Sequence, residues 1–148
     1  MIMPVQLTPE MTKEIADQLD MGMKCFYHEP TGELEYYPDE FKYPGFDEEL
    51  WAEAIDKVEE NFHEYVVFTG MESRESFEIM EDFINEIPQE KIRDKFINAI
   101  ERRKPFQQFK NLLLDYPDLR EQWFAYKDKR YIEYVEEQVE AYNSRQEE

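Results

Sequence analysis

The chain has 148 residues, a length typical of one domain that buries an apolar core without disulfide or metal support. Hydrophobic residues make up 41% of it and aromatic residues 16%, which excludes a disordered polymer although 36% of the residues are charged. The formal net charge of −19 makes non-specific binding of the whole molecule to nucleic acid or anionic lipid unfavourable. We therefore expect a single folded domain over residues 1–148.

The cysteine content and the N-terminus bear on the cellular compartment. Cys25 is the single cysteine and cannot form an internal disulfide, so nothing indicates an oxidising compartment. The first residues lack the basic start and long apolar run of a signal peptide, and no later stretch approaches the roughly 20 apolar residues of a membrane span. We predict a cytoplasmic protein with no membrane attachment.

The first seventy residues predict two helices and three strands. Thr, Pro and Glu at positions 8–10 are typical of a helix start and predict a helix over residues 8–21. Polarity alternates over residues 23–37 on both sides of a turn that contains Pro and Gly, which predicts a β-hairpin. A helix with an apolar stripe follows Asp47, and residues 64–69, rich in β-branched and aromatic side chains, predict a third strand.

The second half of the chain predicts helices only, over residues 73–142, with Pro105 and Pro117 at two helix starts. The apolar stripe of the last helix slips at residues 127–130, so we expect a kink or a change of packing partner there. Residues 143–148 are predicted to form a frayed acidic tail. The fold class is therefore α+β, with a small three-stranded antiparallel sheet packed against helices and a helical C-terminal half.

Three segments carry a resemblance to a known family. Residues 78–84 contain a Met-x-x-Phe motif, residues 106–110 read Phe-x-x-Phe-Lys, and residues 122–124 contain an aromatic pair led by Trp. Together they resemble the bacterial uncharacterised protein family 0158, over residues 23–139. In that family a small turn with Gly or Ala usually precedes the Phe-x-x-Phe segment, whereas this chain has Arg-Arg-Lys-Pro at 102–105. The resemblance implies a shared fold but no activity, because the family has none assigned.

Motifs for cofactor and metal binding are missing from the sequence. The four glycines are too scattered to build a phosphate-cradling loop or a dinucleotide fingerprint. His28 and His63 belong to no zinc-ligand spacing, and the carboxylates of residues 78–86 are typical of the solvated face of a helix. Cys25 and His28 point to opposite faces of a strand, which favours an ordinary buried thiol. We expect no cofactor and no metal.

The distribution of charge indicates a candidate binding region. Residues 91–130 hold 11 of the 17 basic residues and 6 of the 36 acidic ones, a local balance of +5 against −24 elsewhere. A cation at a helix end interacts favourably with exposed carbonyls, so a structural role for residues 102–104 is natural, and docking of an acidic partner or a phosphate is the functional interpretation. The candidate binding residues are Arg102, Arg103, Lys104, Lys110, Lys127, Lys129 and Arg130.

No catalytic signature is present, and we expect a non-catalytic interaction or regulatory protein with segregated acidic and basic surfaces and a protein partner. Two alternatives stay open. One is a nucleic-acid or phosphate-ligand binder that uses the basic block at 102–130, although the net charge disfavours it. Its stacking surface would consist of Phe106, Phe109, Trp123, Phe124 and Tyr126. The other is a hydrolase of unrecognised type with carboxylates near the hairpin and residues 78–86.

Overall fold

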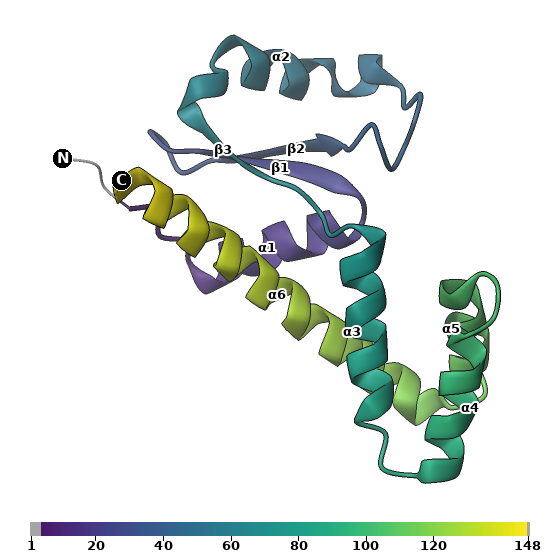
Figure 1. Ribbon diagram of the computed structural model, residues 1–148. Coiled ribbons are helices and arrows are strands. Elements are labelled where there is room, and N and C mark those ends of the chain that lie inside the picture. Colours follow the sequence, from purple (N-terminus) through teal and green to yellow (C-terminus); the bar gives the residue numbers. More distant parts are fainter. Residues whose placement is uncertain (1–3, 148) are drawn as a thin grey trace. The chain divides into compact units, whose positions relative to one another are not determined.

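The computed structural model describes residues 4–147 and confirms the α+β fold, with a three-stranded antiparallel sheet and a helical C-terminal half (Figure 1). The chain divides into two compact units. Unit 1 contains Met1–Gly70 and Tyr131–Glu148, and unit 2 contains Met71–Arg130. The charge composition follows this division. Unit 1 carries 23 acidic and five basic residues, a net charge of −18, whereas unit 2 carries 13 and 12, a net charge of −1.

Unit 1 is built around the sheet. Its strands follow the order β2–β1–β3, and central β1 pairs antiparallel with both neighbours, so Cys25 lies opposite Tyr36 on one side and Phe68 on the other. The elements of this unit in chain order are α1 (Pro9–Asp20), β1 (Met23–His28), β2 (Leu34–Pro38), the 3₁₀-helix η1 (Glu48–Trp51), α2 (Ala52–Glu60), the 3₁₀-helix η2 (Phe62–Glu64), β3 (Tyr65–Phe68) and the second half of α6 (Pro117–Glu147).

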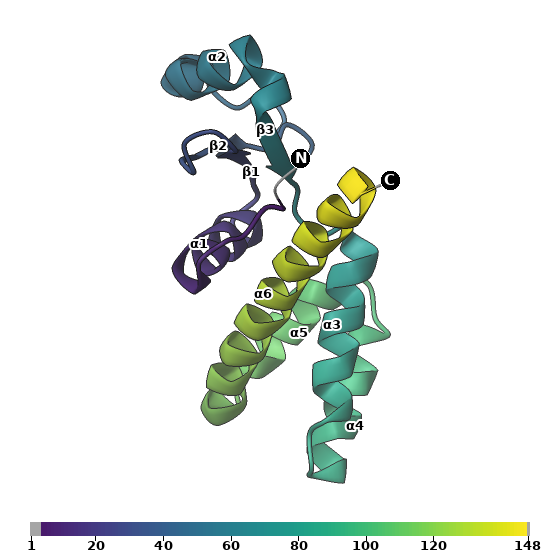
Figure 2. The same ribbon diagram turned by 90° about the vertical axis from the view of Figure 1, so that its left-hand side faces the viewer.

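Both faces of the sheet are covered within unit 1. Figure 2 shows α1 and α2 on opposite sides of the three strands. Because side chains alternate along a strand, consecutive residues of β1 serve the two faces. Cys25 lies against α1, where its Sγ is 3.9 Å from the carbonyl oxygen of Ile15, and Phe26 packs with Val58 of α2. Both Cys25 and Phe26 are 2% exposed, so the sheet has a core on each face.

The C-terminal helix is tied to the start of the chain. The side chain of Asn143 accepts a hydrogen bond from the backbone N–H of Val5 (2.9 Å) and donates one to the carbonyl oxygen of the same residue (3.0 Å). Helix α6 therefore continues to Glu147, five residues beyond the predicted end of the helical region at 142. The predicted tail at 143–148 is helical over its described residues, because Asn143 is held by these bonds; residue 148 lies outside the described part.

The slip in the apolar stripe of α6 marks a change of packing partner. The helix is unbroken across residues 127–130, and the boundary between the units falls directly after Arg130. Before the boundary, Trp123 packs against Phe109 of unit 2, with ring centroids 4.9 Å apart. After it, Tyr134 Oη donates to the carbonyl oxygen of Gly70 in unit 1 (3.3 Å).

Unit 2 is entirely helical in its regular structure. It contains α3 (Ser73–Asn85), α4 (Glu90–Ile100), α5 (Pro105–Leu113) and the first half of α6. Prolines occupy the first positions of α5 and α6, where the missing N–H costs no intrahelical hydrogen bond. The core is a cluster of aromatic rings around Phe109, whose centroid lies 4.9–6.3 Å from those of Phe83, Phe96 and Trp123. These contacts join all four helices of the unit.

Candidate functional site

All seven candidate cations lie in unit 2, but they fall into separate groups. The connection between α4 and α5 consists of Glu101 followed by three cations, Arg102, Arg103 and Lys104, which we call the basic turn. Lys110 lies on α5, and the remaining three lie on α6. The structure thus places them on different elements, and each group has its own surroundings.

Two of the three candidate cations on α6, Lys127 and Arg130, are engaged within unit 2. Arg130 Nη1 donates to Asp82 Oδ2 (2.8 Å) and to Tyr126 Oη (2.7 Å), and the hydrogen bond to Asp82 is the main reason that the pKa of Arg130 is raised further. Lys127 Nζ lies 5.7 Å from the ring centroid of Phe124, over which Arg120 also sits at 4.9 Å. Arg130 therefore serves packing between α3 and α6, and cations of this unit cover the exposed ring of Phe124.

The aromatic side chains considered for stacking also fall into separate groups, some in the core and some on the surface. Phe109 is 2% exposed and Trp123 is 9% exposed, and both belong to the core of unit 2. Phe106 and Phe124 are 37% and 42% exposed, but they stand on different helices. These side chains do not form one continuous surface on a single element.

The basic turn is exposed and lacks ion pairs. Within residues 4–147, Arg102, Arg103 and Lys104 make no salt bridge to a carboxylate. The backbone of the turn closes α4, because the N–H of Arg102 donates to the carbonyl oxygen of Ala99 (3.3 Å). Three positive charges are therefore presented on a short, defined turn.

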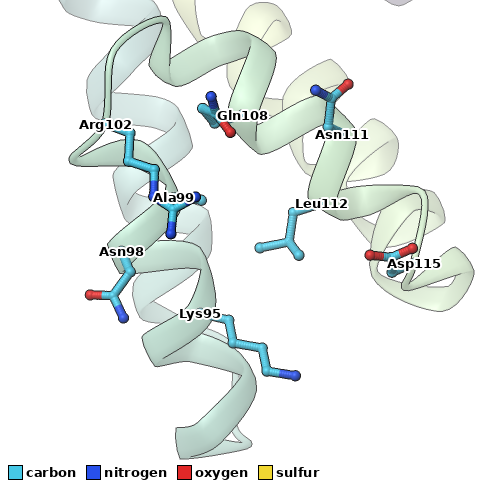
Figure 3. A pocket seen from close by; sticks show the side chains of 8 residues that line it. All are labelled: Lys95, Asn98, Ala99, Arg102, Gln108, Asn111, Leu112 and Asp115. Atoms are coloured by element: carbon cyan, nitrogen blue, oxygen red, sulfur yellow. The ribbon is translucent and has the colours of Figure 1, made fainter.

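A groove of about 370 Å³ lies between α4 and α5, next to the basic turn (Figure 3). Its walls carry three carboxamides, two cations and one carboxylate, and Ala99 and Leu112 add the apolar part. Figure 3 shows the Leu112 side chain pointing from α5 toward α4. The lining residues are Lys95, Asn98, Ala99, Arg102, Gln108, Asn111, Leu112 and Asp115.

Of these lining residues, the sequence prediction included only Arg102. The carboxamides were missed, although a signal was present in their spacing. Positions 95, 98 and 102 on one helix, and 108, 111 and 115 on the other, repeat at three and four residues. This spacing places each polar set on one helical face, and the short connection between the helices brings the two faces together.

Lys104 has a left-handed backbone conformation, with φ 56° and ψ 59°. This region is sterically unfavourable for a residue with a Cβ atom and is readily adopted by glycine. The backbone of Lys104 is therefore strained.

We expect Lys104→Gly to raise the free energy of unfolding by about 1 kcal/mol relative to Lys104→Ala, because only glycine relieves the left-handed strain. Both substitutions remove the same charge, so the comparison isolates the backbone term. Urea denaturation followed by circular dichroism measures the difference. Equal stabilities of the two variants would show that the turn carries no strain.

Cys25 and His28 have separate surroundings, and the alternation of side chains along β1 predicts that they point to opposite faces of the sheet. His28 Nε2 lies 2.7 Å from Glu64 Oε1 and its Nδ1 lies 2.7 Å from Thr31 Oγ1, which links the end of β1 to η2 and to the hairpin turn. The Cys25 thiol is buried beneath α1, and burial, with a smaller contribution from Glu14, raises its pKa to about 12. This is the environment of a core thiol and not of a nucleophile.

At pH 8 a thiol of that pKa is ionised in only about one molecule in 10⁴, so we expect iodoacetamide to leave Cys25 unmodified in the native protein. Because the pKa is raised, reactivity should increase with pH up to about pH 12 and should appear at once on unfolding in urea. Mass spectrometry after timed alkylation measures both. Rapid native modification at pH 8 would contradict the buried position.

Two acidic side chains of α3, Glu78 and Asp82, pair with cations of unit 2. Arg74 Nε lies 3.7 Å from Glu78 Oε1, and Asp82 bonds Arg130.

Across residues 4–147, no three His, Cys, Asp or Glu side chains converge in an arrangement suited to a metal ion. Over the same residues, no helix combines the length and apolarity that crossing a bilayer requires.

Comparison with known proteins identifies the family of the chain. The family described as "Uncharacterised protein family (UPF0158)" matches residues 30–146, so the match starts seven residues later and ends seven residues later than the resemblance seen in the sequence. A curated relative, the "UPF0158 protein PA5073" of Pseudomonas aeruginosa, is 30% identical over 82 residues, which are 55% of this chain and 54% of the relative. The chain thus spans about half the length of that relative. No solved structure matches.

Proposed function

The chain belongs to the uncharacterised protein family UPF0158. From the geometry of the candidate site, we propose that it is a non-catalytic interaction protein. In this proposal the groove between α4 and α5 holds an extended, acidic segment of a partner protein, and the protein acts in the cytoplasm. The observation that carries the proposal is the lining of the groove, where three carboxamides and two cations stand beside Arg103 and Lys104, which make no ion pair within residues 4–147.

The carboxamides favour an extended polypeptide as the ligand. Asn98 and Gln108 each offer both a donor and an acceptor, which is the pair of groups that the backbone of an extended chain presents. Asn111 offers its Nδ2 donor, while its Oδ1 accepts a hydrogen bond from Gln107 Nε2 (2.9 Å). The pair formed by Asn143 with the N–H and carbonyl oxygen of Val5 is an example of this recognition within the protein itself. Ala99 and Leu112 supply apolar contact between the polar walls.

The charges favour an acidic segment. Lys95 and Arg102 line the groove and are opposed by one carboxylate, Asp115. Arg103 and Lys104 extend the positive charge beyond the mouth of the groove. Since unit 1 carries a net charge of −18, an acidic partner is repelled from most of the molecule and attracted here, which gives orientation as well as affinity.

Nucleic acid is less well supported as the ligand. Stacking on bases requires several free aromatic faces beside the cations, but Phe109 and Trp123 belong to the core, and the partly exposed Phe106 and Phe124 lie on different helices. A groove walled by carboxamides also lacks the density of positive charge that a phosphate backbone requires. A polypeptide partner accounts for more of the lining residues.

Fluorescence anisotropy with a short, fluorescein-labelled peptide of alternating glutamate and serine tests the proposal. We expect the intact chain to bind this peptide and Arg102→Glu to weaken binding about 10-fold, since one charge contact becomes a repulsion. Arg74→Glu, which changes the net charge equally at an exposed site of the same unit, should weaken it no more than about twofold. Preferential binding of a single-stranded oligouridine probe in place of the peptide would contradict the proposal.

A further inference from the structure

A second surface lies in unit 1, on the loop between β2 and η1. Phe41 is 83% exposed, more than any other large apolar side chain of residues 4–147. Tyr43 is 45% exposed and donates a hydrogen bond from its Oη to the carbonyl oxygen of Met21 (2.7 Å), which is itself 51% exposed. We call Met21, Phe41 and Tyr43 the Phe41 patch.

The backbone that carries Phe41 is held firmly. Buried Asp39 accepts the N–H of Phe41 with its Oδ1 (2.9 Å), and its carbonyl oxygen accepts the N–H groups of Lys42 (3.0 Å) and Tyr43 (2.9 Å). The N–H of Asp39 donates in turn to the carbonyl oxygen of Gly22 (3.0 Å). Four hydrogen bonds thus fix a short turn whose central side chain is left in solvent.

Two glycines make room for this loop. Gly22 has φ +90°, and a Cβ atom at that position would lie 2.6 Å from Cε2 of Tyr43. At Gly70, a Cβ atom would lie 2.9 Å from Nζ of Lys42. The close approach of the Tyr43 ring therefore requires glycine at position 22, whereas the end of the flexible Lys42 side chain near Gly70 can shift. An exposed aromatic ring on a pre-organised turn loses little conformational entropy on binding, which is the property of an anchor residue in an interface.

The charge around the Phe41 patch indicates the chemistry of the partner. Glu40 precedes Phe41 in the chain and Lys42 follows it, and unit 1 as a whole carries a net charge of −18. We propose that the patch docks a protein partner that offers an apolar pocket within a Lys- and Arg-rich surface, with Phe41 inserted in the pocket. A second copy of unit 1 is disfavoured at this site, because two strongly acidic surfaces repel each other.

Binding at the Phe41 patch is independent of binding in the groove of unit 2. A protein that uses both sites would join a basic partner to an acidic one. The probe is a fluorescein-labelled amphipathic peptide of leucine and lysine, with leucine at helical spacing on one face, and fluorescence anisotropy of the full chain measures its binding. We expect Phe41→Ala to weaken binding roughly 10- to 30-fold. Leu50→Ala is the matched control, since Leu50 is also in unit 1 and is 78% exposed, and it should change affinity by no more than about twofold.

Further variants separate insertion of Phe41 from attraction by charge alone and from self-association. Replacement of leucine by serine in the peptide, at constant charge, should reduce binding as much as Phe41→Ala does, whereas an unchanged affinity would indicate charge alone and overturn the proposal. Equal losses from Phe41→Ala and Leu50→Ala, or a wild-type dimer in sedimentation velocity that Phe41→Ala abolishes, would also overturn it. Arg102→Glu should leave binding of this peptide intact. The proposal for the groove in unit 2 and the proposal for the Phe41 patch are therefore tested independently.

Discussion

Phe109→Ala should destabilise unit 2 by about 3–5 kcal/mol, the usual cost of removing a fully buried aromatic ring. Phe109 is 2% exposed, and its ring contacts those of Phe83, Phe96 and Trp123, so each of the other helices of the unit loses a contact. A cavity of this kind consumes much of the stability of a small unit, because folded domains are stable by only about 5–15 kcal/mol. Urea denaturation, followed by tryptophan fluorescence of Trp123 together with Trp51, measures the loss.

Phe106→Ala is the matched control for this substitution. Phe106 stands on the same helix, is 37% exposed and makes one aromatic contact, edge to face with Phe77 at 6.2 Å. Its replacement should cost no more than about 1 kcal/mol. Similar losses from the two substitutions would mean that Phe109 is not the centre of the core of unit 2.

Reversal of all three charges in the basic turn should abolish recognition of the acidic peptide, with a fall in affinity of about 30-fold or more. The variant is Arg102→Glu, Arg103→Glu and Lys104→Glu. These side chains make no ion pair within residues 4–147, so their replacement breaks no ion pair there and the fold should persist. Anisotropy with the glutamate–serine peptide, beside circular dichroism of each variant, separates binding from folding.

The same change in net charge at other exposed positions controls for long-range repulsion. Arg74→Glu, Lys91→Glu and Arg145→Glu together alter the charge by the same amount but lie outside the basic turn and the groove. This variant should retain peptide binding within about threefold at moderate salt, where exposed charges are screened beyond roughly 10 Å. A fall as large as that of the basic-turn variant would assign the effect to total charge and not to the turn.

Local sequence patterns accounted for most of the secondary structure. The N-cap at Thr8 and the prolines at positions 105 and 117 each mark a helix start, because capping and the missing proline N–H act over one turn of chain. The alternation in residues 23–37 predicted the hairpin for the same reason. The end of α6 was misplaced, since what holds it is a pair of hydrogen bonds from Asn143 to Val5, across almost the whole chain.

The candidate site was predicted only in part. The charge of a segment can be counted in the sequence, but the sequence does not show which side chains from different helices come together. The excess of positive charge around residues 102–104 could be read directly from the sequence. The interaction of Arg130 with Asp82 depends on the packing of α3 against α6, and no local pattern indicates it. The carboxamides of the groove follow a helical spacing that is common on solvated faces, so their meeting across the turn required the structure.

Titration of the ¹⁵N-labelled chain with the glutamate–serine peptide, followed by two-dimensional NMR, shows directly whether the groove of unit 2 binds an acidic segment. We predict chemical-shift changes that concentrate on the backbone and carboxamide signals of Asn98, Gln108 and Asn111 and on the backbone of the basic turn. Signals of the sheet in unit 1 should stay unchanged. Shifts that gather on the aromatic side chains of α6, or a titration with no localised change, would contradict recognition of the peptide in the groove.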